Sequence, residues 1–461
     1  MPRLLPPEGL TRGGVRSRRR APGRRGCGWR GCAAVLTSLT ALAATSLIAP
    51  TAAVPLSMPC ALKRTAAHHS EGLDTWNAAY PRPLRRLDAV MVFLSFPDAE
   101  PLTRPADLTA DYFPATSHFF AQASYGKFRL RPHPLREWIR MPRASTAYAM
   151  QRDWHAAARS AYLRDALAAA DGRVDFSRYD VVYFVADPDA PGVDSDATKV
   201  VNLDVPLRAD GADIRRVVTV FEKHPPDRLV LAHETGHVFD LPDLYHRPVD
   251  GKGDWDTHVG DWDLMGSQFG LAPDLFGWHK WKLGWLEPRQ VRCVVGAGRR
   301  GARLTLEPLA AGAGAGVGAG SGVGAAGPES SWRAGAPEGG LGWAGSGSAG
   351  GTKLAVVRTA RDRVVALEVR GPAGNDRAAC AQGVLVYRVR SGAESGRGPI
   401  EVVDAHPESG DCWDDSVYGP LADAPVGVGE SFTVPGEDVR VEVHDRTASG
   451  AWTVTVTTDT S

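Results

Sequence analysis

The chain has 461 residues, and its 53 basic side chains balance its 53 acidic ones, so the formal net charge is zero. This neutrality conceals two unlike parts: residues 1–53 hold nine arginines and one acid, a net charge of +8, which leaves a net charge of −8 for the remainder. An acidic body argues against a surface that binds nucleic acid or anionic lipid, because both partners need clustered positive charge.

The first 53 residues have the layout of an export signal. An arginine-rich region comes first, an apolar stretch follows at residues 33–48, and the small residues 51–53 suit cleavage. A membrane anchor is the alternative, but this 16-residue stretch falls short of the roughly 20 residues that span a bilayer. We therefore predict a signal peptide over residues 1–53 and a secreted, extracellular protein that has no membrane contact after cleavage.

Four of the six cysteines lie after the signal: Cys60, Cys293, Cys380 and Cys412. In an oxidising compartment, four cysteines predict two disulfides, with three connectivities that the sequence does not rank. A different role is open to Cys60, whose thiolate could block a metal until the chain is processed.

The 408 residues after the signal exceed one typical domain, so we expect two domains. They begin with an irregular stretch, residues 54–86, which is rich in proline, alanine and histidine. We interpret this stretch as an N-terminal arm or a short pro-segment.

The first domain is expected to combine strands and helices. Residues 88–96 form a nearly continuous apolar run, which predicts a strand buried on both faces. Apolar residues at helical spacing follow over residues 153–170, and two further apolar runs predict strands at 179–186 and 216–221. With a further helix from Asp227, this pattern predicts an α/β layered domain over residues 87–290.

The pattern changes after residue 288 to short β-branched runs that are separated by turn residues. Seven such runs predict an all-β, sandwich-like C-terminal domain over residues 291–461. The predicted strands are 354–358, 364–370, 384–389, 400–403, 431–434, 439–443 and 452–457. Residues 310–351 hold 16 of the 51 glycines and almost no apolar bulk, so we predict a disordered insertion there.

The most informative motif is His233-Glu234-x-x-His237. On a helix that begins near Asp227, an acceptable N-cap, the two histidines stand at i and i+4 and share one face. Two neutral imidazoles at this spacing can bind one Zn²⁺, and Glu234 lies beside them, where it can reach a water. A catalytic zinc site needs a third protein ligand and an open position.

Asp243 is the candidate for the third ligand, ten residues after His233. Its carboxylate can return to the metal only if the helix stops soon after His237 and the chain turns sharply. Pro242 cannot continue a helix, and Asp240 tolerates a left-handed turn better than most residues do.

These residues carry a resemblance to the metzincin zinc peptidases, whose pattern is H-E-x-x-H-x-x-G-x-x-H/D with a methionine turn beyond it. The version with aspartate third resembles the immune-inhibitor-A-like branch of secreted bacterial metallopeptidases. Further similarity lies in the segments 96–98 (FPD), 124–128 (SYGKF), 240–245 (DLPDLY), 260–267 (GDWDLMGS) and 277–286 (GWHKWKLGWL). The similarity covers residues 60–290 well and the β-rich tail more loosely, and the family usually has glycine where this chain has Asp240.

The resemblance implies an α+β, metzincin-like catalytic domain with a mixed sheet and an active-site helix, and it implies defined residue roles. His233, His237 and Asp243 would bind zinc, and Glu234 would be the general base. Met265 would underlie the site as a packing floor. From its position alone, Tyr245 could approach the oxyanion or could simply pack in the turn.

Other residues leave alternatives open. Two acidic clusters offer oxygen ligands for Ca²⁺ or form solvated loops. They are Asp187, Asp189, Asp194 and Asp196, and Asp250, Asp254 and Asp256. His246, His258 and His279 are expected at the surface or as helix caps.

The sequence therefore predicts a secreted zinc endopeptidase that acts as a monomer on protein or peptide substrates. The alternative is an exported binding or adhesion protein whose tail engages a polymer or surface, with a metal site that is structural, incidental or degenerate through Asp240.

Overall fold

A computed structural model describes residues 58–226, 229–248, 252–269, 274–312, 350–416 and 418–458. Residues 57–461 belong to one compact unit. The predicted signal peptide and most of the predicted insertion at 310–351 lie outside the described residues. No helix in the described ranges is long and apolar enough to cross a membrane.

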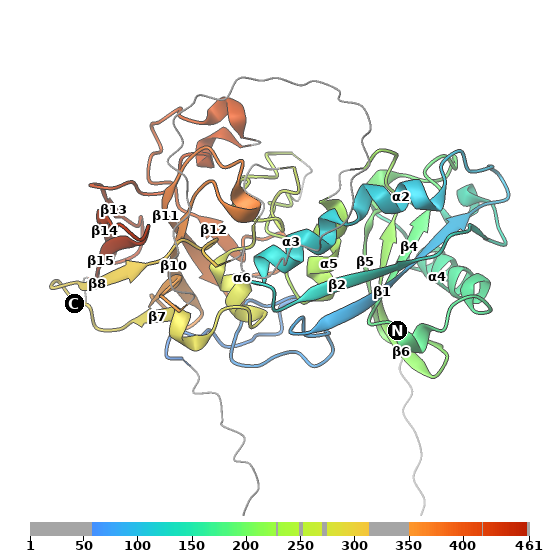
Figure 1. Ribbon diagram of the computed structural model, residues 1–461, viewed down its shortest axis with the longest axis horizontal. Helices are drawn as coiled ribbons and strands as arrows, with labels where there is room; N and C mark the ends of the chain where they lie inside the picture. Colours follow the sequence, from blue (N-terminus) through green and yellow to red (C-terminus); the bar gives the residue numbers. More distant parts are fainter. Residues whose placement is uncertain are drawn as a thin grey trace, which may run out of the picture. The chain divides into compact units, whose positions relative to one another are not determined.

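The first part of the chain is built on a six-stranded mixed sheet. Its strands are β1 (Arg86–Ser95), β2 (Arg129–Pro134), β3 (Ile139–Arg140), β4 (Val181–Ala186), β5 (Lys199–Ala209) and β6 (Ala212–Val220). The order is β2-β1-β4-β6-β5, with β3 also pairing β1, and all pairs are parallel except β5 with β6 (Figure 1). Strand β5 is therefore an antiparallel edge strand.

Helices cover both faces of this sheet, which explains the continuous apolar runs of its central strands. On one face, Met91 and Phe93 of β1 share a core with residues of three helices. These are α2 (Pro105–Tyr112), α3 (Ala115–Ala123) and α5 (Val230–Val238). On the other face, Val92 and Phe184 pack with Tyr162 of α4 (Ala156–Ala170). The predicted strands at 88–96, 179–186 and 216–221 and the helix at 153–170 are confirmed within a few residues.

The C-terminal β region, residues 291–458, consists of two sheets. A five-stranded sheet has the order β12-β11-β10-β9-β7, and a four-stranded sheet has the order β13-β14-β15-β8. The strands are β7 (Val291–Val294), β8 (Ala302–Leu306), β9 (Leu354–Arg358), β10 (Arg363–Arg370), β11 (Gly383–Arg390), β12 (Ile400–Val402), β13 (Ser431–Thr433), β14 (Val439–Arg446) and β15 (Trp452–Thr458). All seven predicted strands are present, and β7 and β8 are additional.

The five-stranded sheet is buried on both faces. Toward the four-stranded sheet, Leu367 and Val386 share a core with Val441. On the opposite face, Ala366 and Tyr387 belong to the same core as α5 and α6 (Gly277–Lys282). The C-terminal β region is therefore packed against the first part of the chain through a continuous apolar core.

Two disulfides confirm the pairing of the four cysteines after residue 57. Cys60 pairs with Cys293, and Cys380 pairs with Cys412. The alternative role of Cys60 as a metal-blocking thiolate is wrong, because its sulfur is bonded to Cys293 of β7. Two disulfides fit an oxidising compartment.

The N-terminal segment, residues 58–85, is anchored by buried charges as well as by Cys60. His279 of α6 lies between two carboxylates, with Nε2 2.8 Å from Glu71 Oε1 and Nδ1 3.2 Å from Asp263 Oδ2. All three side chains are completely buried. The expectation of a surface or capping role for His279 is wrong, because both of its ring nitrogens are needed to hold buried carboxylates.

This arrangement predicts a loss of stability at alkaline pH. Burial opposes protonation of His279, but Glu71 and then Asp263 outweigh it and raise its pKa from 6.5 to about 9. A raised folded-state pKa stabilises the protein fully below pH 6.5, and this contribution is lost as the pH rises through 9. We expect the metal-loaded protein to lose about 3 kcal/mol of unfolding free energy over that window. Urea titrations at several pH values would measure it.

The matched variant is His279→Gln, which cannot titrate. Its unfolding free energy should be lower at neutral pH and should lack this part of the pH dependence. An identical pH dependence in both proteins would contradict the assignment.

Candidate metal centre

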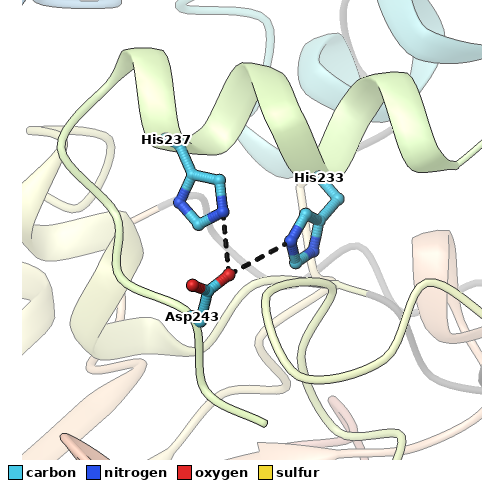
Figure 2. Close-up of side chains that lie close together, drawn as sticks. All are labelled: His233, His237 and Asp243. Atoms are coloured by element: carbon cyan, nitrogen blue, oxygen red, sulfur yellow. Dashed lines mark ion pairs between the residues drawn. The ribbon is translucent and has the colours of Figure 1, made fainter. Parts of the chain in front are cut away.

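The two motif histidines lie on helix α5, whose nine residues are all buried. The helix begins at Val230 with Leu229 at the N-cap position and no side-chain cap, while the predicted cap, Asp227, lies outside the described residues. His233 and His237 project from one face of the helix, as the i, i+4 spacing predicts (Figure 2).

A left-handed turn after α5 returns the chain to these histidines. Asp240 has a φ of +68°, and the Leu241 N–H donates to the carbonyl of Gly236 at 3.2 Å. Asp243 Oδ1 then lies 2.9 Å from His237 Nε2 and 3.4 Å from His233 Nε2 (Figure 2). The three residues predicted to hold the metal are thus brought together by the predicted turn.

Backbone carbonyls orient both imidazoles. His233 Nδ1 donates to the carbonyl of Leu264 at 2.9 Å, and His237 Nδ1 donates to that of Leu241 at 2.8 Å. When the ring is neutral, each Nε2 therefore carries a free lone pair. The neutral imidazole is the form of histidine that binds metals.

The three side chains form a group that could hold a metal ion. Asp243 Oδ1 is buried without a hydrogen-bond partner among the described residues and faces the two Nε2 atoms. In the metal-free protein, burial disfavours charged His237, but Asp243 outweighs it and raises the pKa of His237 to about 9. A proton thus satisfies the site in part, and a divalent metal would satisfy all three ligands. The donor set fits Zn²⁺, which takes histidine nitrogen and carboxylate oxygen.

Glu234 lies beside the three candidate ligands, but its own hydrogen bond is to strand β5. Its Oε2 accepts a hydrogen bond from the Val200 N–H of the edge strand β5 at 2.8 Å. Burial raises its pKa above the usual glutamate value, although both histidines oppose this shift. A buried carboxylate beside the candidate metal ligands is placed where it can accept and release a proton.

Met265 lies under the helix at the point where α5 has a glycine. A Cβ on Gly236 would come within 2.5 Å of Met265 Sδ, so a larger residue there would force the Met265 side chain to move. Met265 is fully buried, its N–H donates to Asp263 Oδ1, and its carbonyl accepts from the Leu244 N–H. Its position agrees with the predicted role as a packing floor.

An open cavity of about 620 Å³ adjoins the three ligands and Glu234. Strand β5 contributes Lys199 and Val200 to its lining, and Tyr245 and Trp255 contribute aromatic rings. The Tyr245 ring stacks on that of His233 with centroids 6.2 Å apart. Burial and the charge of Asp243 raise the pKa of Tyr245, so its phenol stays protonated and can donate a hydrogen bond.

Two segments from outside the predicted motif also reach the site. His69 of the N-terminal segment stacks on His237 at 5.6 Å, and its Nδ1 lies 3.0 Å from Asp240 Oδ1. Ser395, from the loop between β11 and β12, hydrogen-bonds to Asp243. No local pattern in the sequence marks His69 or Ser395, because each contact joins residues more than 150 positions apart.

The proposed calcium ligands have other contacts. Asp196 pairs with Arg152 at 3.0 Å, Asp187 accepts from the Asp189 N–H, and Asp254 accepts from the Asp256 N–H.

Among the described residues, the second group that could hold a metal consists of Asp404, His406 and Asp423. Both ring nitrogens of His406 already have polar partners, the carbonyl of Asp423 and the carboxylate of Glu430. Calcium binding therefore stays a prediction.

No protein-family model matches this chain, and no curated protein matches it. The geometry of the site therefore carries the functional proposal.

Proposed function

We propose that this chain is a secreted, zinc-dependent endopeptidase. One observation carries the proposal: two imidazole Nε2 atoms and Asp243 Oδ1 converge beside the buried Glu234 at an open cavity. A structural zinc site would close its fourth position with another cysteine or histidine. The motif resemblance to immune-inhibitor-A-like peptidases implies the same function.

The residues of the chain supply the remaining chemistry. When bound, zinc lowers the pKa of a water molecule and polarises a carbonyl group. Glu234, held by the Val200 N–H, would accept a proton from the attacking water and deliver it to the departing amine. Tyr245 would donate a hydrogen bond to the developing oxyanion. The edge strand β5 borders the cavity, and an extended peptide can pair with such an edge.

In the alternative, an exported binding or adhesion protein, the metal site is structural, incidental or degenerate through Asp240. Asp240 adopts the required left-handed conformation, and Asp243 reaches both histidines. These two observations count against a degenerate site, and the open cavity with Glu234 beside the cluster favours the peptidase over a structural metal site.

Removal of the metal is the direct test. We expect the secreted protein to contain about one zinc per chain, to hydrolyse casein, and to lose this activity in 1,10-phenanthroline, because the attacking water depends on the metal. Added zinc should restore hydrolysis. Zinc-loaded protein that cleaves neither casein nor a diverse peptide mixture would contradict the proposed function.

A further inference from the structure

We propose that the C-terminal β region is part of the metal centre, with Ser395 as a positioning residue for Asp243. The inference rests on the proposed function of the site, because it concerns the third ligand of the same metal. Ser395 lies in the loop 391–399, between β11 and β12, and lines the cavity.

The hydroxyl of Ser395 makes two hydrogen bonds to one residue. Its Oγ donates to Asp243 Oδ2 at 2.9 Å and accepts from the Asp243 N–H at 2.8 Å. The backbone and the carboxylate of Asp243 are thereby tied to one atom, which restricts rotation of the side chain. With Oδ2 engaged, Oδ1 is the oxygen directed at His233 and His237. Such a partner for a ligating carboxylate holds it ready for the metal.

Backbone contacts keep Ser395 in place. The Gly396 N–H donates to the Asp243 carbonyl at 2.9 Å, and the Arg247 N–H donates to the Gly396 carbonyl at 3.1 Å. Gly396 has a φ of +72°, and a Cβ there would lie 3.1 Å from Arg247 Cβ. The close approach of the two backbones therefore depends on this glycine.

The loop 391–399 is also held in place where it leaves β11. The hydroxyls of Thr65 and Ser70, in the N-terminal segment, both donate to the carbonyl of Ser391 at 2.7 Å. At the other side of the hairpin, the Arg390 N–H donates to the carbonyl of Pro399. Ser395 is thus presented by an ordered hairpin, and its position depends on the five-stranded sheet.

Assembly of the metal centre would then depend on the C-terminal β region. The motif from His233 to Asp243 is complete in the sequence, yet its third ligand is oriented by a residue 152 positions later. The metal centre reaches full affinity only after the C-terminal β region has folded against the first part of the chain. The β-rich tail therefore contributes to metal binding directly, in addition to any accessory role.

The test is Ser395→Ala in the full secreted chain. This variant keeps the backbone bonds of Gly396 and removes only the hydroxyl. We expect zinc affinity, measured by competition with a chelator, to fall about 10- to 100-fold. The d–d absorption of the Co²⁺-substituted protein should change, because the carboxylate is no longer held in one orientation. Ser395→Thr keeps the hydroxyl and should restore affinity.

The matched control is Ser431→Ala, which removes an exposed serine–arginine hydrogen bond in the same β region and should change neither measurement. The thermal stability of the metal-free proteins separates positioning from misfolding. Unchanged zinc affinity and an unchanged cobalt spectrum in Ser395→Ala would overturn the inference, even if the wild-type protein is an active peptidase. Conversely, a wild-type protein that binds zinc without cleaving peptides would overturn only the proposed function. Failure of the wild-type protein to bind zinc would overturn both.

Discussion

Replacement of Glu234 by glutamine should leave zinc bound and lower kcat by about 100- to 10,000-fold. Glutamine has nearly the same shape and can still accept the Val200 N–H bond, but it cannot accept a proton from water. The three ligand atoms belong to other residues, so the metal should remain. Peptide-cleavage kinetics and elemental analysis of the same preparation would measure both quantities.

Two further variants serve as controls for Glu234→Gln. His233→Ala removes a ligand and should lose zinc together with activity. Glu100→Gln changes an exposed carboxylate that does not line the cavity and should leave both nearly unchanged. Full turnover by zinc-loaded Glu234→Gln would refute the role of Glu234 as general base.

The sequence predicted most central elements because their patterns are local. β1 and β4 are continuous apolar runs, and all seven predicted strands of the C-terminal β region are bounded by turn residues. β5 was not predicted, because its exposed edge carries polar residues and Pro206, which an edge strand tolerates. Its register also shifts between Asn202 and Leu207, which breaks the alternation.

The candidate site was predictable only where its parts are close in sequence. The spacing of His233, His237 and Asp243 follows from helix geometry and one turn. Ser395 and His69 depend on tertiary packing of distant segments, so no motif could indicate them. His279 was misassigned for the same reason: its partner Glu71 lies more than 200 residues earlier.

Replacement of Asp240 by alanine should destabilise the protein by about 3–5 kcal/mol, because it breaks a buried ion pair with Arg64. The Asp240 carboxylate is fully buried, with Oδ2 2.6 Å from Arg64 Nη2 and Oδ1 3.0 Å from His69 Nδ1. Burial would raise its pKa, but His69, Lys282 and Arg64 together lower it, so the carboxylate stays charged. Alanine would remove these contacts and would also be strained at a φ of +68°.

Asp240→Gly and Asp240→Asn separate the two contributions. Glycine accepts the left-handed turn without strain, so it should be more stable than alanine by about 1 kcal/mol. It still leaves Arg64 and His69 without their partner, so it should remain clearly less stable than the wild-type protein. Asparagine tolerates the turn and keeps one hydrogen bond, so we expect an intermediate value. Urea unfolding of the zinc-loaded proteins would rank them.

The order of stability of these variants shows whether Asp240 acts through its charge or only through its left-handed conformation. Its carboxylate joins the N-terminal segment to the turn that carries Asp243, so loss of the charge should loosen both ends of that contact. Limited proteolysis should then cut the N-terminal segment of Asp240→Gly faster than that of the wild-type protein. If Asp240→Gly is as stable and as resistant as the wild type, the charges contribute nothing, and Asp240 serves only to form the turn.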